Sequence, residues 1–130
     1  MLLMLAAAAV GGCATTNDAA CRPDEKRRVS DTLYLGAAKP DGTVQPAEWS
    51  RFLEEWVTPR FPDGLTVWQA AGQWRGADGT IVEEPSRVVN LIHAGAEEDE
   101  RKVAEISSEY KRRFQQEAVL RTRSAVCVSF

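Results

Sequence analysis

Histidine and cysteine are scarce in this chain. Its 130 residues include one histidine and three cysteines, and no two cysteines have the Cys-x-x-Cys spacing. A zinc site needs several ligands at short spacings, and the lone His93 cannot complete one. Nucleophilic catalysis needs a serine or cysteine beside a positioned base, and nothing around His93 indicates such a pair. The sequence therefore predicts no metal site and no catalytic residues, and His93 is interpreted as a strand-end residue with satisfied hydrogen bonds.

A large excess of charge of one sign is also absent. The formal net charge is -3 and the pI is about 5.2. Domains that bind nucleic acid usually carry a basic face, so a nucleic-acid partner is not expected. Gly72, Gly76 and Gly79 do not open a helix, so they predict no phosphate-binding loop, and no cofactor is expected. The hydrophobic fraction of 44% is ordinary for a soluble globular domain with one core.

No apolar run is long enough to span a bilayer, which takes about 20 residues. The run at residues 2–10 has the length of the apolar region of a secretory signal. It ends in Val10-Gly11-Gly12-Cys13, which resembles a bacterial lipobox, although no Lys or Arg precedes the run. Residues 1–13 are therefore predicted to be a signal peptide with Cys13 lipidated. An ordinary cleaved signal or a chance Ala/Leu-rich end is the alternative.

Ala14 after this cysteine favours sorting to the outer membrane in bacteria that use that rule. We therefore expect an exported protein on the periplasmic side of the cell envelope, in contact with a membrane through its lipid. Residues 14–30 are polar, contain proline and lack periodicity, which predicts a flexible tether. A single domain is then expected over residues 31–130.

Alternating apolar residues and turn residues divide that domain into strands and helices. Strands are predicted at residues 31–37, 65–68 and 87–93, with a hairpin joining 73–75 to 80–82 and a last strand at 118–130. Pro85 is expected at an edge or a bulge, because proline cannot donate to a strand ladder. Helices are predicted to begin at Pro46 and Glu97, each with one apolar face.

This order of elements is the split βαβ pattern. It predicts an α+β fold, a ferredoxin-like βαββαβ sandwich with two helices on one face of a four-stranded antiparallel sheet. An α+β fold with another strand order is the fallback. In the predicted sheet the last strand lies beside the first, so Cys127 comes close to the chain that leads into strand one. Because export permits disulfides, Cys21 and Cys127 are predicted to pair.

Five separated motifs in this domain occur in the same order as in a known family. They are LYLG (33–36), TPRFPDGLTV (58–67), GQWRG (72–76), EPS (84–86) and YKRRFQQEAVL (110–120). The chain resembles the bacterial exported family called domain of unknown function 3574. That resemblance implies an exported, often lipid-anchored domain and brings no assigned activity and no catalytic residue.

The sheet face opposite the helices is the candidate functional surface. Strict alternation directs one set of side chains to the helices: Leu33, Leu65, Val67, Val89, Leu91, Leu120 and Val128. It directs another set to the open face: Tyr34, Trp68, Val88, Asn90, Ile92, Arg121 and Arg123. The candidate ligand or interface residues are Tyr34, Trp68, Asn90, Arg121 and Arg123. A bulge near Pro85 or Ser124 would reverse this assignment locally.

Aromatic rings and guanidinium groups on one surface suit a small anionic or aromatic ligand, or a second copy of the domain. We therefore expect a non-catalytic binding or self-association module. The alternative is a small periplasmic enzyme of the dimeric α/β-barrel type with its active site on the same face. Glu83 and Glu84 are adjacent on a strand and point to opposite sides of it, which does not suit joint acid-base work.

Overall fold

The computed structural model describes residues 20–130. The predicted signal peptide, the predicted lipidation site Cys13 and the first part of the predicted tether lie outside the described residues. Within residues 20–130, no helix has the length and apolar character that crossing a membrane requires.

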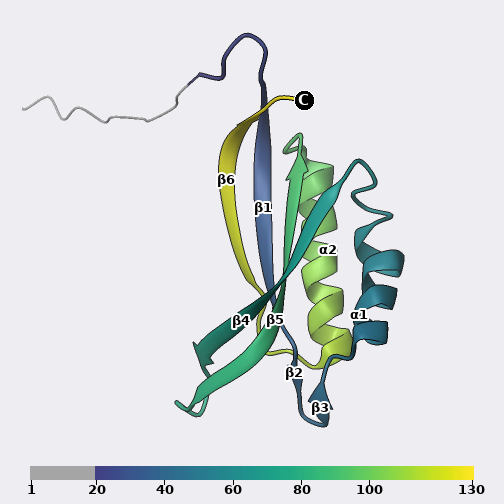
Figure 1. Cartoon of the computed structure of the whole chain (residues 1–130), viewed down its shortest axis with the longest axis vertical. Helices are drawn as coiled ribbons and strands as arrows, with labels where there is room; N and C mark the ends of the chain where they lie inside the picture. The colour runs from purple at the N-terminus through teal and green to yellow at the C-terminus, as the bar shows by residue number, and fades with distance from the viewer. Residues whose placement is uncertain (1–19) are drawn as a thin grey trace, which may run out of the picture.

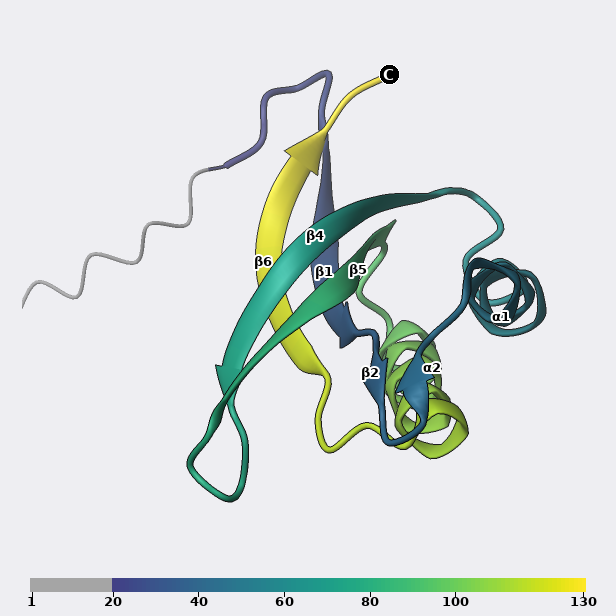
Figure 2. The same cartoon turned by 60° about the horizontal axis from the view of Figure 1, so that its bottom comes forward.

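Four long strands form one antiparallel sheet in the order β4-β5-β1-β6. Both helices lie on the same side of this sheet, and the other side carries no helix (Figures 1 and 2). The predicted ferredoxin-like α+β fold is confirmed. The strands are β1 (Lys26–Gly36), β4 (Leu65–Arg75), β5 (Ile81–His93) and β6 (Leu120–Val128). The helices are α1 (Pro46–Phe52), which continues as the π-helical turn η1 (Leu53–Val57), and α2 (Glu97–Phe114).

β1 begins earlier than the sequence indicates. Lys26 already pairs with Val128 of β6, so residues 26–30 belong to the sheet and not to a flexible tether. The prediction failed there because the basic residues of this segment hid the strand alternation.

β4 and β5 are likewise continuous strands, and their register runs without a bulge from Leu65 opposite Leu91 to Arg75 opposite Ile81. Pro85 fits this ladder because its carbonyl accepts the Ala37 N–H (2.9 Å) on the side where β1 has ended. The missing N–H of the proline therefore costs no pair with β4. The edge position expected for Pro85 is correct, and the bulge is not present.

The core lies between the helices and the sheet. Trp49 and Phe52 of α1 meet Tyr110 and Phe114 of α2 in a cluster of stacked, edge-to-face and tilted rings, with centroids 4.8 to 6.3 Å apart. Such pairs stabilise a core by about 0.5–1.5 kcal/mol each beyond the area they bury. The sheet contributes aliphatic side chains beneath them: Leu33, Leu35, Val89 and Leu91.

Each helix begins at a carboxylate that accepts backbone N–H groups. Glu48 accepts the Gln45 N–H (2.7 Å) at the start of α1, and Asp99 accepts the N–H groups of Gly95 and Ala96 (3.1 Å each) at the start of α2. These bonds satisfy donors that the first turn of a helix leaves free. A small hairpin, β2 (Ala38–Lys39) and β3 (Gly42–Thr43), links β1 to α1.

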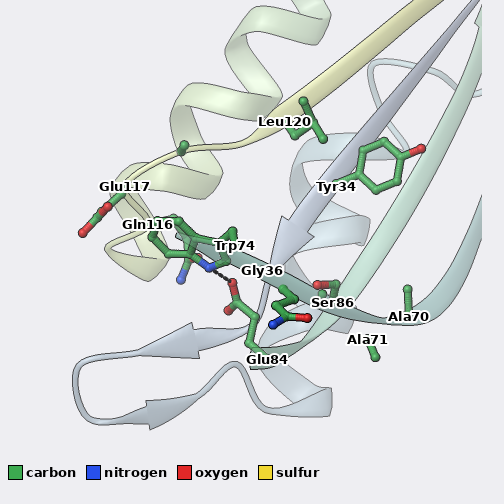
Figure 3. A pocket seen from close by; sticks show the side chains of 13 residues that line it. Tyr34, Gly36, Ala70, Ala71, Trp74, Glu84, Ser86, Gln116, Glu117 and Leu120 are labelled. Atoms are coloured by element: carbon green, nitrogen blue, oxygen red, sulfur yellow. Dashed lines mark hydrogen bonds between the residues drawn. The ribbon is translucent and has the colours of Figure 1, made fainter. Parts of the chain in front are cut away.

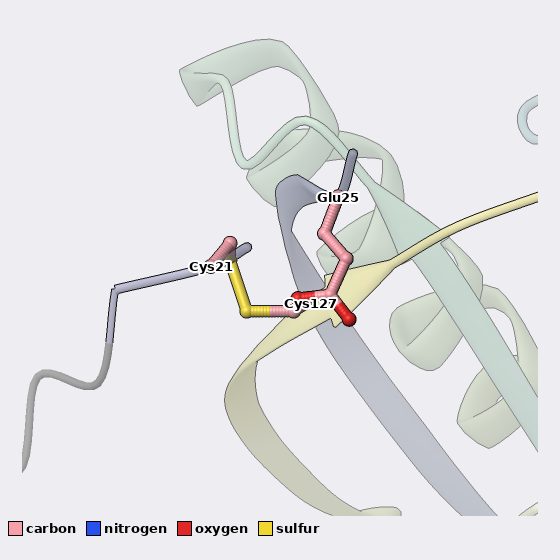
Figure 4. Close-up of side chains that lie close together, drawn as sticks. All are labelled: Cys21, Glu25 and Cys127. Carbon is pink, nitrogen blue, oxygen red and sulfur yellow. A yellow bond between two sulfur atoms is a disulfide. The ribbon is translucent and has the colours of Figure 1, made fainter. Parts of the chain in front are cut away.

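The predicted disulfide is confirmed. Cys21 and Cys127 are bonded with a Cα–Cα distance of 5.5 Å, which joins the segment before β1 to the end of β6 (Figure 4). The Glu25 carboxylate lies beside the two sulfur atoms. Because the sulfurs are bonded to each other, they are not available as thiolate ligands, and this group does not form a metal site as it stands. A disulfide is typical of a compartment outside the reducing cytosol.

Candidate functional site

A cavity of about 330 Å³ lies at one end of the open sheet face. It sits where β1 ends, between the β4–β5 hairpin and the loop that leads from α2 into β6 (Figure 3). Its walls are mainly apolar, and this volume lies within the usual range for small-molecule sites. The residues that build it are Tyr34, Gly36, Ala70, Gly72, Trp74, Glu84, Ser86, Gln116, Glu117 and Leu120, with Ala71, Gln73 and Ala118 at its margin.

Two glycines make room for the polar floor of this cavity. A Cβ on Gly36 would lie 2.4 Å from Oε1 of Glu84, and a Cβ on Gly72 would lie 2.5 Å from Oγ of Ser86. Real Cβ atoms do not come this close to another heavy atom. The carboxylate and the hydroxyl can therefore lie against the strands only because the facing residues have no side chain.

Glu84 is the main polar group of the cavity, and its side chain is hydrogen-bonded through both oxygens. The indole N–H of Trp74 donates to Oε1 (2.7 Å), and the backbone N–H of Ala38 donates to Oε2 (2.6 Å). Two accepted bonds match the hydrogen-bonding pattern of an ionised carboxylate. Glu84 is 8% exposed, and within residues 20–130 it forms no ion pair. An acceptor without a neutralising cation therefore lies at the floor of an apolar cavity.

The far side of the sheet supports this end of β1. The Tyr110 hydroxyl donates to the carbonyl oxygen of Gly36 (2.8 Å). Burial, and to a lesser extent the charge of Glu84, raises the pKa of Tyr110, so its hydroxyl remains a donor. Gln116 donates to the carbonyl of Ala38 at the rim of the cavity. The backbone around Gly36 and Ala38, which holds Glu84, is thus bonded from α2 and from the loop that follows it.

A second polar cluster is buried on the helix side of the sheet. Asp31 is fully buried, and Arg121 donates to both of its oxygens through Nε (2.7 Å) and Nη2 (2.8 Å). His93 Nε2 donates to Oδ2 of the same carboxylate (2.8 Å). Arg121 also donates to Glu100 of α2 (2.8 Å), and Arg123 bonds the same Glu100. This network connects β1, β5, β6 and α2.

The charges in this network shift one another's titration. Burial acts to raise the pKa of Asp31, but the hydrogen bonds from Arg121 and His93 and the charge of Arg121 hold it below its usual range. The hydrogen bond from Arg121, only partly opposed by desolvation, lowers the pKa of Glu100 to about 2. The Arg121 guanidinium has a raised pKa for the same reasons.

His93 is occupied at both ring nitrogens. Its Nδ1 accepts the Gly95 N–H (3.1 Å), which makes Nε2 the donor to Asp31. The interpretation of His93 as a strand-end residue with satisfied hydrogen bonds is confirmed, and its ring is not free to act as a base.

A family model for proteins of unknown function, DUF3574, matches residues 30–130. The chain belongs to the DUF3574 family. No curated protein matches the chain.

The fold of the DUF3574 domain is shared with a solved phage enzyme. A phage SAM lyase in complex with S-methyl-5'-thioadenosine superposes with a TM-score of 0.60 at 17% identity, covering 79% of this chain and 90% of that one. The apo state of a phage SAM lyase gives a TM-score of 0.58 at 17% identity, covering 80% and 90%. At this identity the likeness is one of fold.

Three of the five candidate residues lie on the open face of the DUF3574 domain. Tyr34 is opposite Val88 of β5, which in turn is opposite Trp68 of β4, and Asn90 is one row away. Tyr34 lines the cavity, whereas Trp68 and Asn90 lie beyond it. Their role in binding stays a prediction.

The placement of Arg121 and Arg123 on the open face is wrong. Arg121 is opposite Leu33 and Arg123 is opposite Asp31, so both point toward α2. The opposite parity of β6 carries Leu120 and Val128, which were expected in the core and instead lie on the open face with Tyr34. The physical reason is the buried carboxylate of Asp31, which requires cations on the helix side of the neighbouring strand.

Glu84, Ser86 and Trp74 were not among the predicted site residues. Glu84 and Glu83 do point to opposite sides of β5, and Glu83 is exposed on the other face. The sequence did indicate on which side of β5 Glu84 lies, because Glu84 has the same parity as Val88 and Asn90, which were predicted on the open face.

Proposed function

We propose that the DUF3574 domain binds a small organic molecule in the cavity, and that the ligand combines a flat or apolar body with a cationic or hydrogen-bond-donating group. The observation that carries this proposal is the Glu84 carboxylate, buried at the floor of the cavity without a cation. A buried carboxylate whose hydrogen-bond donors are all neutral is stabilised when a cation binds beside it. Trp74, Tyr34 and Leu120 offer apolar and aromatic contact for the rest of the ligand.

The negative charge of the cavity favours a different class of ligand from the anionic one that the sequence predicted. The predicted anionic ligand depended on Arg121 and Arg123, which lie on the opposite side of the sheet. Glu84 gives the cavity negative character instead, and Glu117 lines its edge with its carboxylate directed outward (Figure 3). An aromatic ligand remains suitable, and its charge is proposed to be neutral or positive.

S-adenosylmethionine and S-methyl-5'-thioadenosine are suitable first probes. S-methyl-5'-thioadenosine is the molecule bound by the phage enzyme of similar fold. S-adenosylmethionine carries an additional 3-amino-3-carboxypropyl group on the sulfur, which makes the sulfur a sulfonium cation and adds an ammonium and a carboxylate group. Both contain a flat adenine ring. Comparing them therefore separates the contribution of the charged sulfonium and amino-acid part from that of the adenine ring.

The deciding experiment is calorimetric titration of both probes into the Glu84→Gln variant and into wild type. A charge-assisted contact contributes about 1.5–3 kcal/mol, so the substitution should weaken the cationic probe at least about tenfold and the neutral probe less. Glu83→Gln is the matched control, because that side chain is exposed on the other face. Equal losses in both variants, or no binding of either probe, would contradict the proposal.

Catalysis in the same cavity is the second candidate, because the neighbour of similar fold is a lyase. It is tested on the same samples by chromatography of S-adenosylmethionine after prolonged incubation. Formation of S-methyl-5'-thioadenosine by wild type and not by Glu84→Gln would establish an enzyme. Binding without turnover supports the non-catalytic module.

We further propose that the domain is exported and anchored to the envelope through lipidated Cys13. The lipobox-like residues 10–13 support the anchor, and the disulfide supports an oxidising compartment. A tether of 12 residues or fewer then separates the lipid from the first strand, since β1 begins at Lys26.

A further inference from the structure

The open face of the sheet is almost free of charge along its centre. By register, alternate residues share this face: Ser30, Thr32 and Tyr34 on β1, and Thr66, Trp68 and Ala70 on β4. No Asp, Glu, Lys or Arg occurs at these positions or at those opposite them on β5 and β6. The central positions are Ser30, Thr32, Tyr34, Thr66, Trp68, Ala70, Ser86, Val88, Asn90, Ile92, Leu120, Thr122 and Ser124.

Large exposed apolar side chains gather on this same face. Tyr34, Trp68, Ile92 and Leu120 are 40 to 61% exposed, and among residues 20–130 only Ile81 and Phe130 are further large apolar residues with such exposure. Contiguous apolar surface of this kind marks an interaction site. The cavity explains Tyr34 and Leu120 but not Trp68 and Ile92, which lie outside it.

The polar groups at the centre of the face already have partners within it. The Asn90 amide donates to Oγ of Ser30 (2.8 Å) and to Oγ1 of Thr32 (2.9 Å). Removing water from this region therefore leaves few unsatisfied groups. Such a surface is suited to being covered by a protein.

The two ends of the face carry opposite charges. Lys26 and Arg28 share its parity at the end where β1 begins, opposite Val128 and Val126. Within residues 20–130, Arg28 forms no ion pair with a carboxylate. Glu84 and Glu117 lie at the other end, in the cavity. Counted along the strands by their register, the point halfway between Arg28 and Glu84 lies between Thr32 and Tyr34 of β1. This point is the apolar centre of the face.

We propose that a second copy of this chain packs on the open face. The two copies are related by a two-fold axis that lies in the plane between the two faces and is perpendicular to the strands. This operation places the basic end of each copy over the acidic end of the other, with Tyr34 and Trp68 near the axis. An axis parallel to the strands would instead bring like charges together. A face that is complementary to itself in this way fits an isologous dimer. The second copy also covers the apolar wall of the cavity and completes its enclosure.

The interface adjoins the proposed ligand site, but it is argued from Trp68, Ile92 and the charges at the two ends of the face, and its test needs no ligand. The full chain with Cys13→Ala, which removes the lipidation site, is measured by sedimentation over a range of concentrations. The expected result is a reversible monomer–dimer equilibrium. Trp68→Arg and Ile92→Arg should each shift it to monomer, whereas Ile81→Arg, a matched exposed isoleucine at the hairpin end of β5, should not. Circular dichroism confirms that each variant is folded.

A charge exchange tests the direction of the axis. Arg28→Glu should raise the dimer dissociation constant about tenfold, because two-fold symmetry counts each contact twice. Adding Glu117→Arg to the same chain should restore most of the loss. A monomer at every concentration, or a dimer unaffected by Trp68→Arg and Ile92→Arg, overturns the interface. Failure of Glu117→Arg to restore association overturns the perpendicular axis. Loss of probe binding in a variant that still dimerises concerns the ligand and leaves the interface standing.

Discussion

Asp31 shows how one buried charge can determine the orientation of a neighbouring strand. Its side chain is inaccessible to solvent, yet both oxygens are bonded to Arg121 and one also to His93. Breaking a buried pair by removing one partner usually costs about 3–5 kcal/mol, since the remaining charge is left uncompensated. The position of β6 beside β1 is therefore tied to this pair as well as to the backbone ladder.

Arg121→Gln is expected to lower the free energy of unfolding by about 3 kcal/mol, because glutamine cannot bond both oxygens of Asp31. Urea denaturation at pH 7 measures this loss. Arg123→Gln is the control, since its partner Glu100 is partly exposed and such pairs contribute less than about 1 kcal/mol. Equal effects of the two substitutions would show that the Asp31 pair has no special weight.

The same pair predicts the acid response. Asp31 and Glu100 have pKa values held below their usual range, to about 2 for Glu100. A carboxyl whose folded pKa is lowered contributes stability that is present above its unfolded pKa, near about 4, and is lost as the pH falls toward the folded pKa. The stability difference between wild type and Arg121→Gln should therefore shrink between pH 4 and pH 2. A constant difference across this range would contradict the assignment.

At the scale of single elements, β6 is where hydrophobic alternation gives the wrong face. Leu120, Val126 and Val128 share one parity, and a rule that sends apolar residues to the core places them under the helices. β6 is an edge strand, so a long side chain such as Arg121 can lie on its helix side and still be partly exposed at the edge of the sheet. The informative residue was Asp31, which shares the parity of Leu33 and Leu35 and therefore needed a cation on that side.

β1 and β4 shape the cavity through two glycines, and this predicts the effect of Gly36→Ala. The new methyl group would lie 2.4 Å from Glu84 Oε1, so the carboxylate must leave its bonds with Trp74 and Ala38. We expect a loss of about 1–3 kcal/mol in urea denaturation together with loss of probe binding. At Gly76 the nearest atom to a Cβ is 3.1 Å away, on the Asp78 side chain, so Gly76→Ala should change little. Unaltered binding in Gly36→Ala would exclude Glu84 as the ligand-binding group.

For the whole molecule, the strand and helix order could be predicted because each element carries its own periodicity and turn residues. The cysteine pairing followed from that order, since the ferredoxin-like sheet places the last strand antiparallel beside the first and so brings residue 127 near the start of the sheet. The cavity could not be predicted, because it depends on β5 continuing past the end of β1. That offset places Glu84 beside Gly36 without any local signal in either strand.

The proposed lipid anchor at Cys13 makes a prediction about the location of the whole chain. Wild type should sediment with membranes after cell disruption and remain there after a carbonate wash, because the acyl chains hold it in the bilayer. Cys13→Ala should appear in the soluble fraction, as measured by immunoblotting of both fractions. A variant that stays in the membrane fraction would contradict lipidation at Cys13.

β1 is the first strand of the described residues 20–130 and an inner strand of the sheet. Both of its neighbours, β5 and β6, are encoded later, and the bond that secures its start uses Cys127, near the C-terminus. During synthesis β1, which is made first, cannot pair with β6 until β6 has been made. A chain that has not been made as far as residue 128 holds β1 without β6 and without its disulfide, so the sheet cannot be completed before the chain is. Passage through a narrow channel as an extended polypeptide needs no unfolding step for a molecule assembled in this order.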